Sequence, residues 1–193
     1  MGVFSKMYDL AIKWSAHRHA PRYLAGMSFA ESSFFPVPVD VMLAPMALAK
    51  PVKAWHFAFI ATLFSVIGGV AGYLIGYFAM DFMEPWLHRL GYWDSYQKAV
   101  ASFNEWGIWI VFLAGVSPIP YKVFTITAGA LSMALLPFIL ISFFARGIRF
   151  YAVSGLILWG GESMEKKLRE YMDAIGWSVV VILAIAYLII KYI

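Results

Sequence analysis

The chain has 193 residues, of which 62% are hydrophobic and only 13% are charged. Soluble domains carry about 25% charged residues, so lipid must solvate part of this apolar surface. The net charge of +4 is modest, and the chain contains no DNA- or RNA-binding motif. Because there is no cysteine, disulfides, thiol catalysis and cysteine metal sites are excluded.

The first region, residues 1–22, mixes apolar side chains with Lys6, Lys13 and Arg18, and Pro21 lies at its end. These charges are incompatible with a membrane span, so we expect an amphipathic helix that lies in the membrane interface. The region lacks the apolar core and small-residue cleavage site of a signal peptide, so we do not expect it to be removed.

Residues 23–80 contain an apolar segment that Pro36 and Pro38 interrupt. Each half, 23–35 and 39–49, has about a dozen residues, whereas a membrane span needs about 20. Proline stops a helix, and backbone opened at membrane depth is tolerated only where protein or water satisfies it. We therefore expect a re-entrant helical hairpin with these prolines at its tip, followed by a span over residues 55–80.

Small residues recur along the 55–80 span at helical spacing, most clearly at Gly68, Gly72 and Gly76. Such a ridge lets another helix backbone approach closely. We expect the ridge to serve helix packing within the chain, and a seam between two copies is the alternative.

Residues 81–106 are polar and aromatic, which predicts an amphipathic connector outside the hydrocarbon. Residues 107–160 then repeat the earlier pattern, with a second apolar segment broken by Pro118 and Pro120 and a span over 137–159. Residues 161–193 supply a charged loop and a last span over 177–193.

The order hairpin, span, connector, hairpin, span predicts a single all-α integral membrane domain with about three transmembrane helices. The two hairpins form an inverted repeat, since an odd number of spans separates them and they enter from opposite faces. Lys and Arg gather on the side that holds the N-terminal helix, the Lys50–Lys53 turn and the loop after residue 161. The positive-inside rule therefore places the N-terminus in the cytoplasm.

Five ionisable residues lie within these segments: Glu31, Asp40, Lys122, Arg146 and Arg149. A charge at the bilayer centre costs at least about 2.5–3.5 kcal/mol, so each should be paired or functional. The acids belong to the first half and the arginines to the second, which predicts pairing between the halves. Ion pairs that only hold the repeats together are one interpretation. A polar pathway is the other, in which the bases attract a phosphate headgroup and an acid exchanges a proton.

Several short motifs follow one another along the chain: Glu31, Phe35–Pro38 with Asp40, the glycine ridge with Tyr73, Pro118 to Pro120, Ala128-Gly129 with Met133, and Phe144–Arg149. In this order and spacing they resemble the DedA family of membrane proteins, which carry the VTT (SNARE-associated) domain. The resemblance is closest to the small bacterial YqaA-like branch and covers roughly residues 31–161.

The resemblance implies two facing re-entrant hairpins in a bacterial inner membrane. It implies translocation or scrambling of phospholipids or of a polyprenyl-phosphate carrier, with Glu31 and Asp40 as functional carboxylates. Many family members carry arginines that flank the second proline motif, where this chain has Gly115 and Tyr121. The arginines at 146 and 149 are then the candidates to supply the missing charge.

A proton-coupled transporter of small ions or amphipathic cations is the second functional hypothesis, with the two carboxylates binding the cargo. A scaffold protein held together by its charges is the third. We expect no enzymatic activity, no metal and no cofactor, because neither a nucleophile triad nor a phosphate-binding loop occurs. The expected partners are membrane lipids with phosphate-bearing headgroups, and protons; nucleic acid is not expected, and a homo-oligomer stays open.

Overall fold

The computed structural model describes residues 19–35, 38–117 and 119–160, and every regular element in these ranges is a helix. The elements are α2 (Ala20–Ser33), α3 (Asp40–Ala49), the short η1 (Pro51–Lys53), α4 (Ala54–Arg89), α5 (Trp93–Val116), α6 (Tyr121–Ala130) and a last helix, Leu135–Gly160. The predicted all-α class is therefore confirmed for these residues. The interfacial helix expected before residue 19, the tip residues Pro36 and Pro118, and the loop and span after residue 160 lie outside the described residues.

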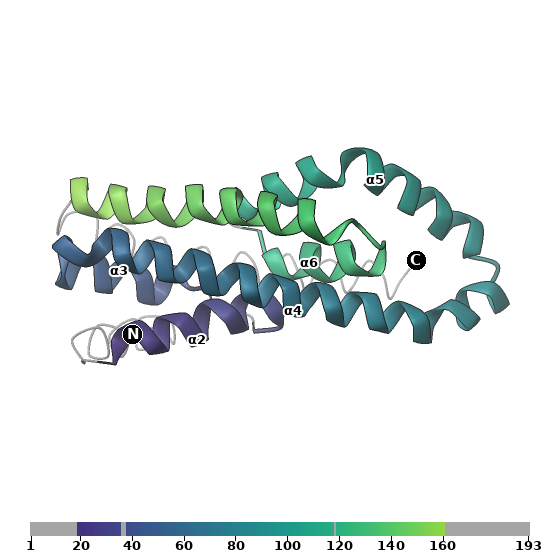
Figure 1. The fold of residues 1–193 in the computed structure, drawn as a ribbon, viewed down its shortest axis with the longest axis horizontal. Coiled ribbons are helices and arrows are strands. Elements are labelled where there is room, and N and C mark those ends of the chain that lie inside the picture. The colour runs from purple at the N-terminus through teal and green to yellow at the C-terminus, as the bar shows by residue number, and fades with distance from the viewer. Residues whose placement is uncertain (1–18, 36–37, 118, 161–193) are drawn as a thin grey trace, which may run out of the picture.

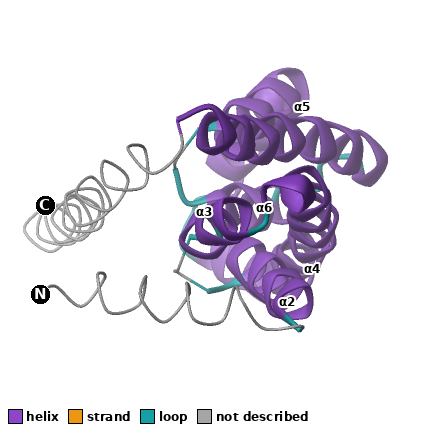
Figure 2. Ribbon diagram, turned by 90° about the vertical axis from the view of Figure 1, so that its left-hand side faces the viewer, coloured by secondary structure: helices purple, strands orange, loops and turns teal. Residues whose placement is uncertain are grey.

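Helix α4 is the helix against which α2, α3 and α6 pack (Figure 1). Helices α2 and α3 lie beside its first half, and α6 lies beside its second half. The Leu135–Gly160 helix runs antiparallel to α4, because Tyr73 contacts Phe138 near one end while Trp55 stacks on Tyr151 near the other. Viewed end-on, α2, α3, α4 and α6 form one group below α5 (Figure 2).

Within the described residues, three helices are long and apolar enough to cross a membrane: Pro51–Arg89, Trp93–Val116 and Leu135–Gly160. The predicted spans 55–80 and 137–159 fall within the first and the third. Residues 81–106, expected as an amphipathic connector outside the hydrocarbon, are helical on both sides of a short turn, since α4 continues to Arg89 and α5 begins at Trp93. Helix α4 continues past Pro85, which lies within it, and no proline interrupts α5 before its end at Val116.

Two helix ends are closed by the same backbone device. Gly91 follows α4 at φ 72°, and the Tyr92 N–H donates to the Leu87 carbonyl. Ser132 follows α6 at φ 53°, and the Met133 N–H donates to the Ala128 carbonyl. These are Schellman motifs, which satisfy carbonyl groups that a helix end otherwise leaves unpaired.

Close backbone contacts hold α2 and α6 against α4. A methyl group on Gly68 would overlap the Phe29 backbone of α2, and one on Gly76 would overlap the Ile126 carbonyl of α6. Gly129 of α6 sits equally close to the Tyr73 backbone. Gly72 lies between these crossings and faces Thr125 and the Ser32 carbonyl. The glycine ridge thus lies at both crossings, where small residues permit the approach.

The chain doubles back at each of its two breaks. Helix α2 begins beside Phe57 of α4, and α3 returns so that Ala47 packs with Ala54. Helix α5 approaches the centre and α6 leads away from it, so that the Tyr96 hydroxyl of α5 reaches the Ala130 carbonyl at 2.8 Å. The breaks meet near the middle of α4, where the Thr125 hydroxyl of α6 donates to the Ser32 carbonyl at 3.2 Å.

Candidate functional site

A buried ion pair joins Arg146 of the last helix to Glu31 near the end of α2. The Arg146 Nε also donates to the Ser65 hydroxyl of α4 at 2.7 Å. The Ser65 and Ser32 hydroxyls are 2.6 Å apart, and the Ser32 hydroxyl lies 3.1 Å from Glu31 Oε2. These four side chains close a ring of hydrogen bonds across three helices. We call them the inner ring.

Aromatic side chains enclose the guanidinium of the inner ring. The Arg146 Cζ lies 5.0 Å from the ring centroid of Tyr121 and 4.6 Å from that of Phe150, within the range of cation–π attraction. The Tyr121 hydroxyl donates to Ser142 on the last helix. Only 1% of the Arg146 side chain and 12% of the Glu31 side chain are exposed. The inner ring is therefore sealed on most sides.

A second ion pair, which we call the outer pair, joins Arg149 to Asp40 in the first turn of α3. Arg149 follows Arg146 by three positions, so both guanidinium groups project from one face of the helix. The other arm of Arg149 donates to the Ser117 carbonyl, which ends α5 at the second break. The outer pair is more accessible, with 13% of Arg149 and 24% of Asp40 exposed.

Two buried polar atoms in this region have no hydrogen-bond partner among the described residues. They are Asp40 Oδ1, an acceptor, and Arg146 Nη1, a donor. Buried polar groups are normally paired, and the exceptions mark places where water or a ligand can bind. The two ion pairs therefore do not use the full hydrogen-bonding capacity of the site.

The remaining predicted site residues surround the two pairs. Lys122 lies in the first turn of α6, half-buried, and pairs with no carboxylate of the described residues. Pro38 precedes α3, and Pro120 is the residue before α6. Proline suits a helix start because it has no N–H to leave unpaired. The breaks therefore coincide with the beginnings of α3 and α6.

The sequence pattern did not single out the hydroxyl side chains of the site as partners of the charges. Ser32, Ser65, Tyr121 and Thr125 are all fully buried. Hydroxyl groups within apolar helices are a recognisable signal, since each needs a hydrogen-bond partner there. The pattern did not say which partner each would find. Within the described ranges, no three His, Asp or Glu side chains gather as metal ligands.

Comparison with known proteins agrees with the motif order. The VTT domain matches residues 37–158, which include Asp40, Lys122, Arg146 and Arg149 but begin after Glu31. A protein of Haemophilus influenzae is 49% identical over 191 residues, covering 99% of this chain and 100% of its own. A protein of Histophilus somni is 48% identical over 191 residues with the same coverage. Both relatives are described as uncharacterized.

No solved structure matches the chain. The domain match covers most of the chain, and the three long apolar helices fit an integral membrane protein. The expected resemblance is thereby confirmed: this chain belongs to the VTT-domain family, also known as the DedA or SNARE-associated family.

Proposed function

We propose that this protein moves lipids with phosphate-bearing headgroups across the membrane, through the polar site between its two helix breaks. The headgroup passes the site while the acyl or prenyl tails stay in the bilayer. The observation that carries the proposal is the meeting of both breaks with two arginine–carboxylate pairs beside α4. In this view α2–α3 is one re-entrant hairpin, and the apolar end of α5 with α6 is the second, inverted one, while the polar first half of α5 belongs to the connector outside the hydrocarbon.

The position of the inner ring along α4 supports a site at membrane depth. Ser65 lies twelve residues after Lys53, which at 1.5 Å per residue is about 18 Å along the helix. The hydrocarbon core is about 30 Å thick. If Lys53 marks one boundary, the inner ring lies close to the bilayer midplane, where charges are costly and are usually functional.

The difference between the two ion pairs suggests a division of labour. The inner ring fixes Arg146 by three kinds of contact, with Glu31, with Ser65 and with two aromatic rings. The outer pair is more exposed and ends at a helix break. A phosphate offers a guanidinium the same paired oxygens as a carboxylate. We expect a headgroup to replace Asp40 on Arg149, while Arg146 and Glu31 remain together.

Two further features favour an anionic headgroup. Helices α3 and α6 both begin at the breaks, and helix N-termini attract negative charge. Lys122 in the first turn of α6 adds a cation that no described carboxylate neutralises.

The test is transport by the purified chain in liposomes that contain a fluorescent phospholipid or a fluorescent polyprenyl phosphate. We expect movement of at least one lipid above that in empty liposomes, and a loss of at least tenfold with Arg149→Gln. A matched control is Arg89→Gln, which removes an arginine near the far end of α4. No movement of either lipid class would refute the proposal.

The same variants separate lipid transport from proton-coupled cation transport. In a cation carrier the carboxylates bind the cargo, so Asp40→Asn would abolish transport while Arg149→Gln would spare it. In the described residues each carboxylate of the site pairs with an arginine, so this pairing by itself does not choose between an anionic and a cationic cargo. Lys122, which pairs with no described carboxylate, is the feature that favours the phosphate-bearing lipid.

A further inference from the structure

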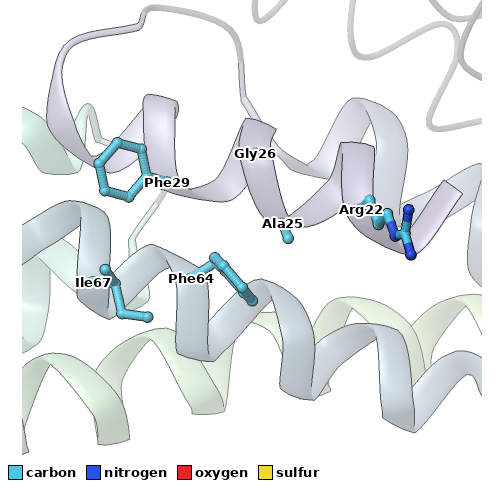
Figure 3. A pocket seen from close by; sticks show the side chains of 6 residues that line it. All are labelled: Arg22, Ala25, Gly26, Phe29, Phe64 and Ile67. Atoms are coloured by element: carbon cyan, nitrogen blue, oxygen red, sulfur yellow. The ribbon is translucent and has the colours of Figure 1, made fainter. Parts of the chain in front are cut away.

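An open groove of about 490 Å³ runs between α2 and α4 (Figure 3), and none of its lining residues belongs to either ion pair. Its lining residues are Arg22, Ala25, Gly26, Phe29, Phe64 and Ile67. Pockets that bind small molecules have volumes of about 300–1,000 Å³, so this groove is large enough for part of a lipid.

The wall formed by α2 is a single helix stripe, since its residues follow one another at intervals of three, one and three. Gly26 leaves the groove open in the middle of this stripe, because a methyl group placed there would meet no other atom within 4 Å. Phe29 lies at one end of the groove, with Phe64 and Ile67 across from it on α4 (Figure 3). These side chains present a continuous apolar surface.

Arg22 gives the opposite end of the groove a positive charge. Its side chain is exposed and forms no ion pair with the described residues. Long basic side chains near helix ends keep their charge at the membrane surface while their stems lie on apolar surface. The groove therefore combines an apolar trough with a cation at one end, which is the order of charge and apolar surface in an anionic phospholipid.

The charge of the surroundings matches the same ligand. In the described part of the chain, the end of the molecule where α2 and α4 begin carries Arg22, Lys50 and Lys53 and no Asp or Glu. The opposite end, around the α4–α5 turn, carries four acids and two bases: Asp81, Glu84, Asp94, Glu105, Arg89 and Lys98. Basic residues near an anionic leaflet each contribute about 1 kcal/mol of attraction.

We infer that the α2–α4 groove binds an anionic phospholipid, with its phosphate on Arg22 and an acyl chain along Phe29, Phe64 and Ile67. This lipid is bound and not transported, since the groove is lined by neither ion pair. By filling the space beside Gly26 it braces α2, which carries Glu31, against α4. The inference does not depend on lipid translocation, because binding alone is measured in its test.

The test uses the full-length protein in phosphatidylcholine vesicles with a small fraction of photoreactive lipid, either phosphatidylglycerol or phosphatidylcholine with a diazirine on the acyl chain. After illumination, mass spectrometry of peptides locates the labelled residues. We expect phosphatidylglycerol to label the groove-lining peptides about fivefold more than phosphatidylcholine, which corresponds to about 1 kcal/mol for one basic residue.

Variants of the groove make the test specific. Arg22→Gln should make the two lipids label equally, and Arg22→Lys should restore the preference for phosphatidylglycerol. Gly26→Leu should reduce labelling by both lipids, because its side chain enters the open space. Arg89→Gln is the matched control and should leave the labelling ratio unchanged. Equal labelling by both lipids in the unchanged protein, or an undiminished preference in Arg22→Gln, would overturn the inference. A groove that neither lipid labels would overturn it as well, because another segment or a second copy would then cover it.

Discussion

Glu31→Gln tests how strongly the fold depends on the inner ring. Glutamine keeps the shape of the side chain and an acceptor oxygen for Ser32 and Arg146, so the change removes mainly the negative charge. Arg146 is then an uncompensated guanidinium with 1% of its side chain exposed. Removing one partner of a buried ion pair costs about 3–5 kcal/mol.

Asp40→Asn is the matched change in the outer pair. Here 24% of Asp40 and 13% of Arg149 are exposed, so water can replace part of the lost interaction. We expect a smaller cost of about 1.5–3 kcal/mol, that of a single hydrogen bond to a charged group. Each substitution replaces one carboxylate oxygen by an amide nitrogen. The difference between the two losses of stability therefore reports burial and the number of partners.

The assay is thermal unfolding of each variant in the same detergent or nanodisc. For a chain of this size, 1 kcal/mol shifts Tm by about 2–4 °C, so Glu31→Gln should lower Tm by roughly 10 °C and Asp40→Asn by roughly 5 °C. The double variant Glu31→Gln with Arg146→Gln should lose less than the sum of the single variants, since no orphan charge remains. Equal Tm losses for the two single variants, or strict additivity in the double variant, would refute this reasoning.

Three further outcomes follow from the described contacts. Gly129→Ala should lower Tm by several degrees or prevent folding, because the added methyl group would overlap the Tyr73 backbone. Ser132→Gly should raise the free energy of unfolding by about 1 kcal/mol, because serine is strained at φ 53°. A Gly129→Ala variant with unchanged Tm, or a Ser132→Gly variant that is less stable, would contradict these contacts. Ser65→Ala should lower the free energy of unfolding by about 1–3 kcal/mol, since it leaves the Arg146 Nε without its acceptor. It should slow lipid transport less than Arg149→Gln does. A larger transport loss than that of Arg149→Gln would argue against the outer pair as the headgroup site.

The sequence was most informative where the physics is local. Pro38 and Pro120 predicted breaks, and the structure places Pro120 directly before α6 and Pro38 two residues before α3, since proline acts on its own backbone. The apolar runs that predicted spans over 55–80 and 137–159 lie within long helices. The polar residues 81–106 predicted a connector outside the hydrocarbon; the structure makes them helical on both sides of a short turn, and their place relative to the membrane stays a prediction.

The partners of the site could not be read from the sequence in the same way. The signs of the charges predicted pairing between the halves, but Glu31 and Asp40 were equally good partners for either arginine. Which carboxylate pairs with which arginine depends on how α2, α3 and the last helix are rotated about their axes. Close contacts such as that of Gly68 with the Phe29 backbone determine this rotation. The inner ring also needs Ser32 and Ser65 to face each other from different helices.

The family resemblance places arginines where this chain has Gly115 and Tyr121, and the surroundings of both positions explain why the charge lies elsewhere. Gly115 packs against Ala145, so even a methyl group there would be crowded. Tyr121 is fully buried and covers the guanidinium of Arg146, so an arginine at 121 would set two cations against each other. The last helix instead brings Arg146 and Arg149 to the break from the opposite side, each with its own carboxylate. Arg149 reaches the Ser117 carbonyl at the second break and Tyr121 covers the guanidinium of Arg146, so two arginines of the last helix lie beside the second proline motif.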